Sequence, residues 1–252
     1  MKAIIFAGPS LPPALRPTDP ALEWRPPVKQ GDVYEAALGR PAIIGIIDGY
    51  FEVTPTVWHK EILWAMSQGI HVYGAASIGA LRAAELHPFG MVGIGRIFEA
   101  YRDGILIDDD EVAVLHGPEE LGYPVLTEAM VNIRATLDKA VEEGVLDSEM
   151  AARLTEISKS LFYKQRGWDT IFRLAVDLNI LPAQPDQPPS VFAGKRVDQK
   201  HIDALEMIAL IRTNLATGVL PVMVSYRFQN TGYHKAGTGT LSLCNSMIPR
   251  PA

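Results

Sequence analysis

Cysteine is nearly absent from this sequence, whose 252 residues include only Cys244. One thiol cannot form an internal disulfide and has no companions for a metal-ligand cluster. Long hydrophobic runs are missing too: the apolar stretch at residues 3–7 is shorter than a signal-peptide core, and no run approaches the length of a membrane span. We therefore expect a cytoplasmic protein with no disulfide, no metal and no cofactor.

An excess of basic residues is also lacking, since 23 Lys and Arg stand against 29 Asp and Glu, a formal net charge of −6. Nucleic-acid-binding domains usually carry a basic patch, so this class of protein is disfavoured. The 48% hydrophobic and 21% charged residues are ordinary for a globular protein. A chain of this length can bury a large core without covalent cross-links.

Three short apolar runs predict buried strands, at residues 3–7, 42–47 and 71–75. The first two are almost continuously apolar, which is typical of strands covered on both faces. Between the second and third, Thr54 as N-cap and Pro55 at the first helical position predict a helix that ends at Gly69. Strand, helix and strand at this spacing predict a βαβ unit with parallel strands.

Helical patterns dominate the rest of the chain, and in the last of them five apolar positions are expected to face the core: Ile202, Leu205, Ile208, Ala209 and Ile211. The expected helices span residues 33–38, 78–86, 97–102, 128–141, 148–161, 168–178 and 198–215. A proline-rich linker is expected at residues 182–189 and a strand-like run at residues 219–226.

These patterns predict an α/β fold in which a short parallel sheet is flanked by helices, a Rossmann-like core, with a helical C-terminal half. We assign residues 1–125 to the α/β core and residues 126–216 to a helical region packed on the same domain. Residues 217–252 are expected to form a tail or flexible arm.

Polar, glycine-containing turns follow all three predicted strands, at residues 8–10, 48–51 and 74–77. The carboxyl ends of parallel strands meet at one edge of the sheet, and ligands of open α/β sheets bind there. We therefore expect a binding site at this edge. Its candidate residues are Gly8, Ser10, Asp48, Gly49 and Tyr50.

Ser77 lies between a strand and a helix, with Ala75, Ala76, Gly79 and Ala80 around it. Small residues allow the sharp turn of a nucleophile elbow, although Ala75 replaces the first glycine of that pattern. The N–H groups of Ile78 and Gly79 would then stabilise an oxyanion. The alternative is that Ser77 only caps the helix, which is the usual role of a serine at such a place.

Lys60 has Val57, Leu63 and Trp64 among its helical neighbours, so it is expected to project from the core-facing stripe. A desolvated lysine has a lowered pKa and can act as a base near neutral pH. The alternative is that Lys60 extends to the surface, as lysines on apolar helix faces often do.

Three further patterns carry less chemistry. The segment Gly93-Ile94-Gly95 resembles a dinucleotide fingerprint, but it lacks the third glycine and follows a predicted helix, so we reject it. The acidic run at residues 108–111 is interpreted as a solvated loop and helix start rather than a cation site, and the six histidines show no metal-ligand spacing. Arg82 and Glu85, three residues apart, would form an ion pair or bind a carboxylate.

Several blocks of the sequence together resemble the TfuA family. They are residues 8–10, 48–51, 58–63, 74–86 and 90–98, followed by Tyr101, Gly104 and residues 109–112, and the resemblance covers about residues 1–140. It implies a partner of a YcaO enzyme in peptide backbone thioamidation, acting as a hydrolase on the C-terminal thiocarboxylate of a ThiS-like carrier protein. The resemblance further implies a Ser–Lys pair, which maps onto Ser77 and Lys60.

In this interpretation Ser77 attacks the thiocarboxylate carbon while Lys60 accepts its proton. Ser10 and Asp48 would help to position the substrate, and Gly8, Gly49, Tyr50, Arg82 and Arg96 would bind it. The precursor peptide of the pathway is a further possible partner. One alternative is a non-catalytic adaptor that docks the YcaO enzyme and its peptide. A second is a serine peptidase, since residues 75–80 are similar to the nucleophile segment of Clp-type proteases.

Overall fold

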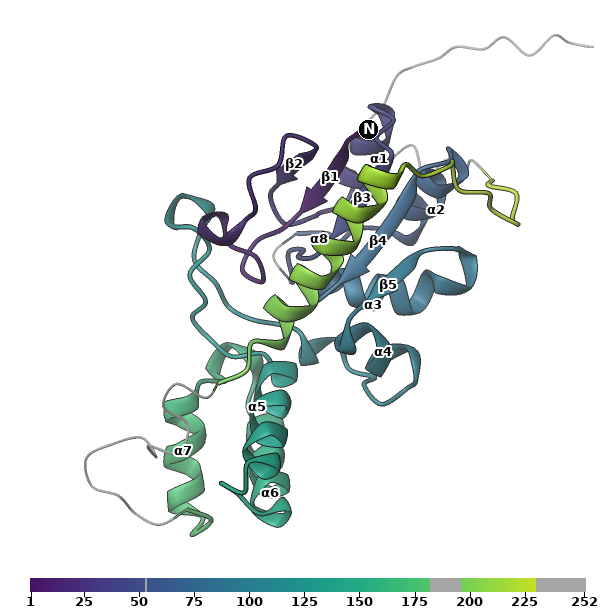
Figure 1. Ribbon diagram of the computed structural model, residues 1–252. Coiled ribbons are helices and arrows are strands. Elements are labelled where there is room, and N and C mark those ends of the chain that lie inside the picture. Colours follow the sequence, from purple (N-terminus) through teal and green to yellow (C-terminus); the bar gives the residue numbers. More distant parts are fainter. Residues whose placement is uncertain (53, 182–195, 230–252) are drawn as a thin grey trace, which may run out of the picture.

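Five parallel strands form one sheet in the order β2-β1-β3-β4-β5, in the computed structural model of the chain (Figure 1), which describes residues 1–52, 54–181 and 196–229. The predicted α/β fold with a parallel sheet is therefore confirmed. The strands are β1 (Ala3–Phe6), β2 (Leu22–Arg25), β3 (Ile43–Ile46), β4 (His71–Ala75) and β5 (Val92–Ile94).

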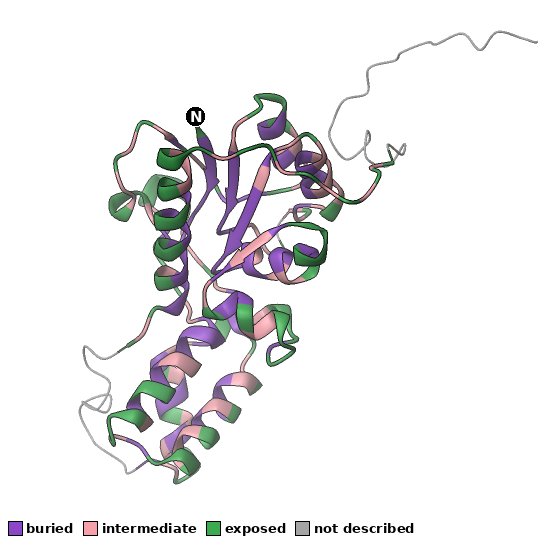
Figure 2. Cartoon of the chain, turned by 45° about the vertical axis from the view of Figure 1, so that its right-hand side comes forward, coloured by how far each residue is buried: buried purple, intermediate pink, exposed green. Residues whose placement is uncertain are grey.

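Helices cover both faces of the sheet, because side chains of each strand point alternately to opposite sides. Ile4, Ile44 and Val72 pack against α1–α4 in one buried cluster, and Ile5 and Ile43 pack against α8 in another. Figure 1 shows α8 running across the sheet, and Figure 2 shows that the central strands are buried beneath the helices. The helices of these two layers are α1 (Asp32–Leu38), α2 (His59–Ser67), α3 (Ile78–Leu86), α4 (Arg96–Arg102) and α8 (Gln199–Thr217).

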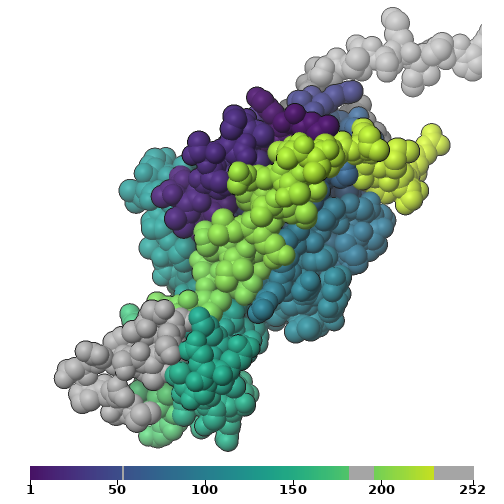
Figure 3. Space-filling view, viewed as in Figure 1, coloured from purple at the N-terminus to yellow at the C-terminus, as the bar shows by residue number. Residues whose placement is uncertain are grey.

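Three further helices form a lobe with a core of its own, seen below the sheet in Figures 1 and 3. Ile133 and Leu137, Leu154, and Ile171 come from successive helices and are buried together. The predicted helical C-terminal part is thereby confirmed. The lobe consists of α5 (Met130–Glu142), α6 (Ser148–Ser160) and α7 (Trp168–Asp177), and short 3₁₀ helices lie at Pro13–Leu15, His87–Phe89, Asp109–Glu111, Glu119–Leu121 and Tyr163–Gln165.

The start of α2 was predicted wrongly, because this helix begins at His59 rather than after Thr54. The carbonyl of Pro55 accepts the N–H of Gln30 at 3.0 Å, so it does not enter a helical hydrogen bond. The buried Glu61 carboxylate accepts the N–H of Trp58 at 3.2 Å and fixes the first turn there. Residues 54–57 are consequently a loop beside the sheet edge.

The strand-like run predicted at residues 219–226 is not a strand in the structure. Residues 218–229 form no strand; Val222 donates its N–H to the carbonyl of Gly69 at 3.0 Å, and the Tyr226 hydroxyl donates to Leu63 at 2.7 Å. The predicted linker at residues 182–189 and most of the predicted arm lie outside the described residues.

Candidate active site

The turn that carries Ser77 has a strained backbone. Ala76, directly after β4, has φ of +67°, which is uncommon for a residue with a Cβ. The N–H of Ser77 donates to the carbonyl of Ala75 at 2.8 Å, closing a three-residue γ-turn around Ala76. Such strain costs about 1–3 kcal/mol and is concentrated at functional sites. The sharp turn expected from the small residues is therefore present.

Ser77 stands at the N-cap position of α3 but does not act as a cap, because its side chain accepts no hydrogen bond from the first turn. The residue is 8% exposed, and it lines a cavity. A serine at an N-cap normally uses its hydroxyl to satisfy a helical N–H. The capping role weighed against the nucleophile is thus absent, and the hydroxyl remains available to a ligand in the cavity.

Close packing of α3 against the strands fixes the position of this turn. A Cβ on Gly79 would lie 1.8 Å from the carbonyl oxygen of Ile46, and one on Gly74 would lie 2.1 Å from the carbonyl oxygen of Gly79. The N–H of Gly79 donates to Ile47 at 3.3 Å, so it is already engaged and is not an open oxyanion donor. The N–H of Ile78 donates to no group in the described part of the chain.

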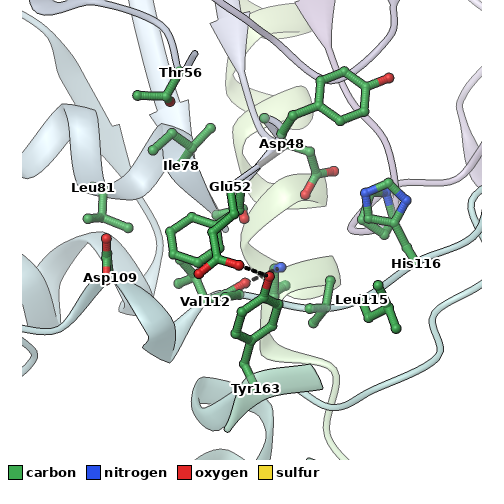
Figure 4. Close-up of a pocket in the computed structure, with 18 of the residues that line it drawn as sticks. Asp48, Glu52, Thr56, Ile78, Leu81, Asp109, Val112, Leu115, His116 and Tyr163 are labelled. Carbon is green, nitrogen blue, oxygen red and sulfur yellow. Dashed lines mark hydrogen bonds between the residues drawn. The ribbon is translucent and has the colours of Figure 1, made fainter. Parts of the chain in front are cut away.

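A cavity of about 930 Å³ opens at the carboxyl edge of the sheet, where ligands bind in folds of this kind. In Figure 4, Thr56, Ile78 and Leu81 lie on one side of it, and Asp48 and His116 lie on the other. The expected site residues that line it are Asp48, Gly49, Tyr50, Ser77, Ile78 and Arg82.

Residues of the sheet and of the helical lobe both line the cavity. The Tyr163 hydroxyl, between α6 and α7, donates to the carboxylate of Glu52 at 2.9 Å (Figure 4), and Lys164 reaches the same carboxylate at 3.0 Å. Glu52 follows β3 in a backbone conformation with φ of +61°. Residues from both parts of the molecule therefore enclose one site.

Asp48 organises the turn that follows β1. Its buried carboxylate accepts the N–H of Gly8 at 2.8 Å, the N–H of Ser10 at 3.0 Å and the Ser10 hydroxyl at 2.6 Å. These bonds hold the ends of β1 and β3 together. Gly8 and Ser10 are therefore part of the support of the site, and neither lines the main cavity.

Lys60 does not occupy the place that the sequence analysis gave it. The buried side of α2 consists of Glu61, Ile62, Ala65 and Met66, whereas Lys60 is half-exposed on the first turn. The prediction that Lys60 projects from the core-facing stripe is wrong, because the helix begins later and turns its other side to the sheet. Lys60 is also not among the residues that line the cavity containing Ser77.

A different lysine, Lys200 in the first turn of α8, lines this cavity. It is 3% exposed, and its ammonium donates to the carbonyl of Val112 at 2.7 Å. Burial lowers the pKa of Lys200, and the charge of Asp48 opposes this shift. Lys200 was not predicted from the sequence, although its place two residues after the helix cap Asp198 was a signal that could have drawn attention to it.

Arg82 lies at the cavity wall, where it donates to the carbonyl of Val57 at 3.2 Å and to Glu85 at 2.7 Å. The suggested ion pair of Arg82 and Glu85 is therefore present, and His59 bonds the same carboxylate at 2.7 Å. Arg96 is exposed at the start of α4 and is not brought into the cavity. Burial raises the pKa of Tyr50, so its hydroxyl stays protonated across the neutral range.

The acidic run at residues 108–111 is paired with cations in the helical lobe. Lys159 contacts Asp108, Asp110 and Glu111; Arg166 bonds Asp110 at 2.7 Å. Arg134 bonds Glu111 at 2.9 Å as a third cation. The oxygens of Asp108, Asp110 and Glu111 lie close enough to hold a metal ion, yet these three cations already balance the charge of the three carboxylates. The segment Gly93-Ile94-Gly95 follows a strand and not a helix as predicted, because Gly93 and Ile94 belong to β5 and Gly95 directly precedes α4. The missing third glycine therefore remains the only reason to exclude a dinucleotide fingerprint here.

None of the described helices is long and apolar enough to cross a membrane. No curated protein matches the chain. Residues 48–167, which include Asp48, Ser77 and most of the cavity lining, match the family described as TfuA-like protein. Over this part, the chain belongs to the TfuA-like protein family.

Proposed function

We propose that this protein is a hydrolase that releases sulfide from the C-terminal thiocarboxylate of a ThiS-like carrier protein, for peptide backbone thioamidation by a YcaO partner. Membership of the TfuA-like family implies the association with YcaO-dependent thioamidation. The hydrolytic reaction and its substrate are our inference. The precursor peptide that receives the sulfur is the partner of the YcaO enzyme in this scheme.

The observation that carries the proposal is the state of Ser77. Its hydroxyl is placed at a helix N-terminus, makes no cap and lines the cavity. A nucleophilic serine needs a fixed backbone and a hydroxyl that can bond a general base instead of a helical N–H. The γ-turn around Ala76 and the tight packing of Gly79 hold the backbone in place.

The surroundings suit an oxyanion intermediate. The first turn of α3 directs the N–H of Ile78 and the positive end of the helix toward the region next to Ser77. A negative charge that develops on the substrate oxygen would be stabilised there. The volume of the cavity lies within the range of about 300–1,000 Å³ that is common for ligand sites.

Sulfide release from a purified thiocarboxylated carrier tests the function. We expect release by the unaltered protein and a loss of at least ~100-fold in Ser77→Ala, because the nucleophile is removed. Ser67→Ala is the matched control, since the Ser67 hydroxyl bonds Trp64 at 2.7 Å on α2 and does not line the cavity. Full activity in Ser77→Ala would exclude the proposed reaction.

An adaptor without catalysis is the second candidate, and one observation favours it. Large apolar side chains are exposed on the segment between α4 and α5, among them Ile107 at 83% and Leu121 at 72%. Such a surface is typical of a docking site for another protein. A serine-reactive phosphonate probe distinguishes the two candidates. A hydrolase is expected to be labelled at Ser77, whereas an adaptor without catalysis is not.

A further inference from the structure

Lys200 lies beside the strand edge that carries Ser77. The helix α8 crosses the sheet, and its Ala204 belongs to the same buried cluster as Ala76. Lys200 is one turn before Ala204, at the end of α8 that reaches the carboxyl edge of the strands. Lys200 and Ser77 both line the same cavity, as does Asp48 from the end of β3.

The surroundings of Lys200 favour a neutral amine. The side chain is almost fully buried, and it occupies the first turn of α8, where the positive end of the helix disfavours a further cation. The carboxylates of Asp48, Asp198 and Glu128 act in the opposite direction. They come from three parts of the chain, namely the end of β3, the cap of α8 and the segment before α5, and the bond to the carbonyl of Val112 fixes the amine.

Lys200 also borders a second cavity, of about 180 Å³, which shares Pro9 and Val114 with the first. Its lining is mixed: apolar side chains such as Val125 and Val197 stand beside Glu128, Asn132 and Asp198, together with Arg196. Groups of this kind hold water well. Lys200 therefore borders both the cavity of Ser77 and a second cavity whose polar side chains suit the water needed to complete a hydrolysis.

We propose that Lys200, rather than Lys60, accepts the proton of the Ser77 hydroxyl, directly or through one water molecule. This inference rests on the proposed function for its substrate, but the activation of Ser77 by Lys200 is a property of the free protein. The lysine lies outside residues 48–167, in the C-terminal part of the chain.

The reaction balances with these two side chains. The Ser77 oxygen forms a bond to the thiocarboxylate carbon while Lys200 takes the hydroxyl proton. The bond between carbon and sulfur then breaks, and Lys200 returns the proton to the sulfur, which leaves as HS⁻. Water attacks the resulting ester and gives one proton to Lys200, which passes it to the Ser77 oxygen. The products are a carboxylate, HS⁻ and one proton released to solvent.

Labelling of Ser77 by a fluorophosphonate probe tests the inference on the full-length protein, without the carrier. We expect labelling by the unaltered protein to rise with pH and Lys200→Met to label at least ~100-fold more slowly, as for loss of a general base. Lys60→Met is the matched control and should label within ~3-fold of the unaltered rate. Methylamine in the buffer should partly restore labelling of Lys200→Ala.

Lys200→Arg is a second variant for the case in which Lys200→Met fails to fold. It keeps the positive charge, but arginine cannot act as a base at these pH values. Circular dichroism and the melting temperature confirm the fold of each variant. Labelling at the unaltered rate in a folded Lys200→Met or Lys200→Arg, or a loss confined to Lys60→Met, would overturn the inference. So would the absence of labelling at Ser77 in the unaltered protein. Lysine-dependent labelling without sulfide release from the carrier would instead refute only the proposed function.

Discussion

Replacement of Gly79 by alanine is expected to displace the nucleophile without touching it. The new Cβ would lie 1.8 Å from the carbonyl oxygen of Ile46, and Cβ atoms essentially never approach another atom closer than 3.0 Å. The start of α3 must therefore move by at least 1.2 Å, since the obstructing atom belongs to the backbone of β3. Ser77, two residues earlier, moves with it.

The energetic cost can be estimated from the same contacts. Overpacking costs about 1–3 kcal/mol, and loss of the bond from Gly79 to Ile47 costs about 1 kcal/mol. Alanine is favoured over glycine within a helix by about 1 kcal/mol, so we expect a net loss of about 1–3 kcal/mol in the free energy of unfolding. A displacement of about 1 Å at the reacting atom slows catalysis by roughly 100-fold.

Urea unfolding and the labelling rate of Ser77 measure the two effects in Gly79→Ala. The matched control is Gly39→Ala, at the end of α1, where the backbone φ is −73° and the nearest atom to a new Cβ is 3.4 Å away. We expect the stability of this control to change by less than about 0.5 kcal/mol. A Gly79→Ala protein as stable and as reactive as the unaltered one would refute the close packing of the turn.

Three further changes test the support of the site. Asp48→Asn removes the charge that accepts three hydrogen bonds, so urea unfolding should show a loss of about 2–3 kcal/mol in the free energy of unfolding. The pH midpoint of Ser77 labelling should also fall in this variant, because Asp48 raises the pKa of Lys200. An unchanged stability would contradict the supporting role of Asp48. Arg166→Leu leaves the Asp110 carboxylate and the carbonyl of Ser158 without their buried donor, so the same assay should show a loss of about 3 kcal/mol in the free energy of unfolding. An unchanged stability would show that the helical lobe does not depend on the pair of Arg166 and Asp110. Burial lowers the pKa of Lys200, so the unfolded chain binds more protons than the folded one at pH values between the folded pKa and the ordinary value of 10.5. The stability of the unaltered protein relative to Lys200→Met should therefore rise with pH across that window. A stability difference that stays constant with pH would refute a lowered pKa.

The buried strands were predictable because strands covered on both faces consist mainly of apolar residues. β1 and β3 are almost continuously apolar, β4 is apolar after His71, and the predicted bounds of β4 and α3 agree with the structure. β2 was missed because this edge strand contains Glu23, Trp24 and Arg25. β5 was missed because it has three residues, one of them a glycine.

The pairing of side chains in the site was less predictable, because it depends on contacts between distant parts of the chain. Ser77 was identified from its small neighbours, which are local. Lys200 meets Val112 across 88 positions, and no periodicity records such a contact. The predicted face of α8 was wrong at Ile202, Leu205 and Ala209, which are exposed, and right at Ile208 and Ile211.

The rotation of α8 has a physical cause. Asp203 is fully buried, and its carboxylate accepts the N–H of Ile97 at 2.8 Å at the start of α4. This bond satisfies a helical N–H and turns a polar residue inward, so Ala204 and Met207 follow it into the core. A pattern that counts only apolar residues cannot anticipate a buried carboxylate.

The acyl-enzyme on Ser77 is the central claim, and mass spectrometry of a quenched reaction, before and after digestion, tests it most directly. The protein is mixed with a thiocarboxylated carrier, quenched in acid within the first turnover and digested. The account predicts a covalent adduct whose mass equals the carrier acyl group and whose site is Ser77. Sulfide release with no adduct on Ser77, and with unchanged release in Ser77→Ala, would contradict the account.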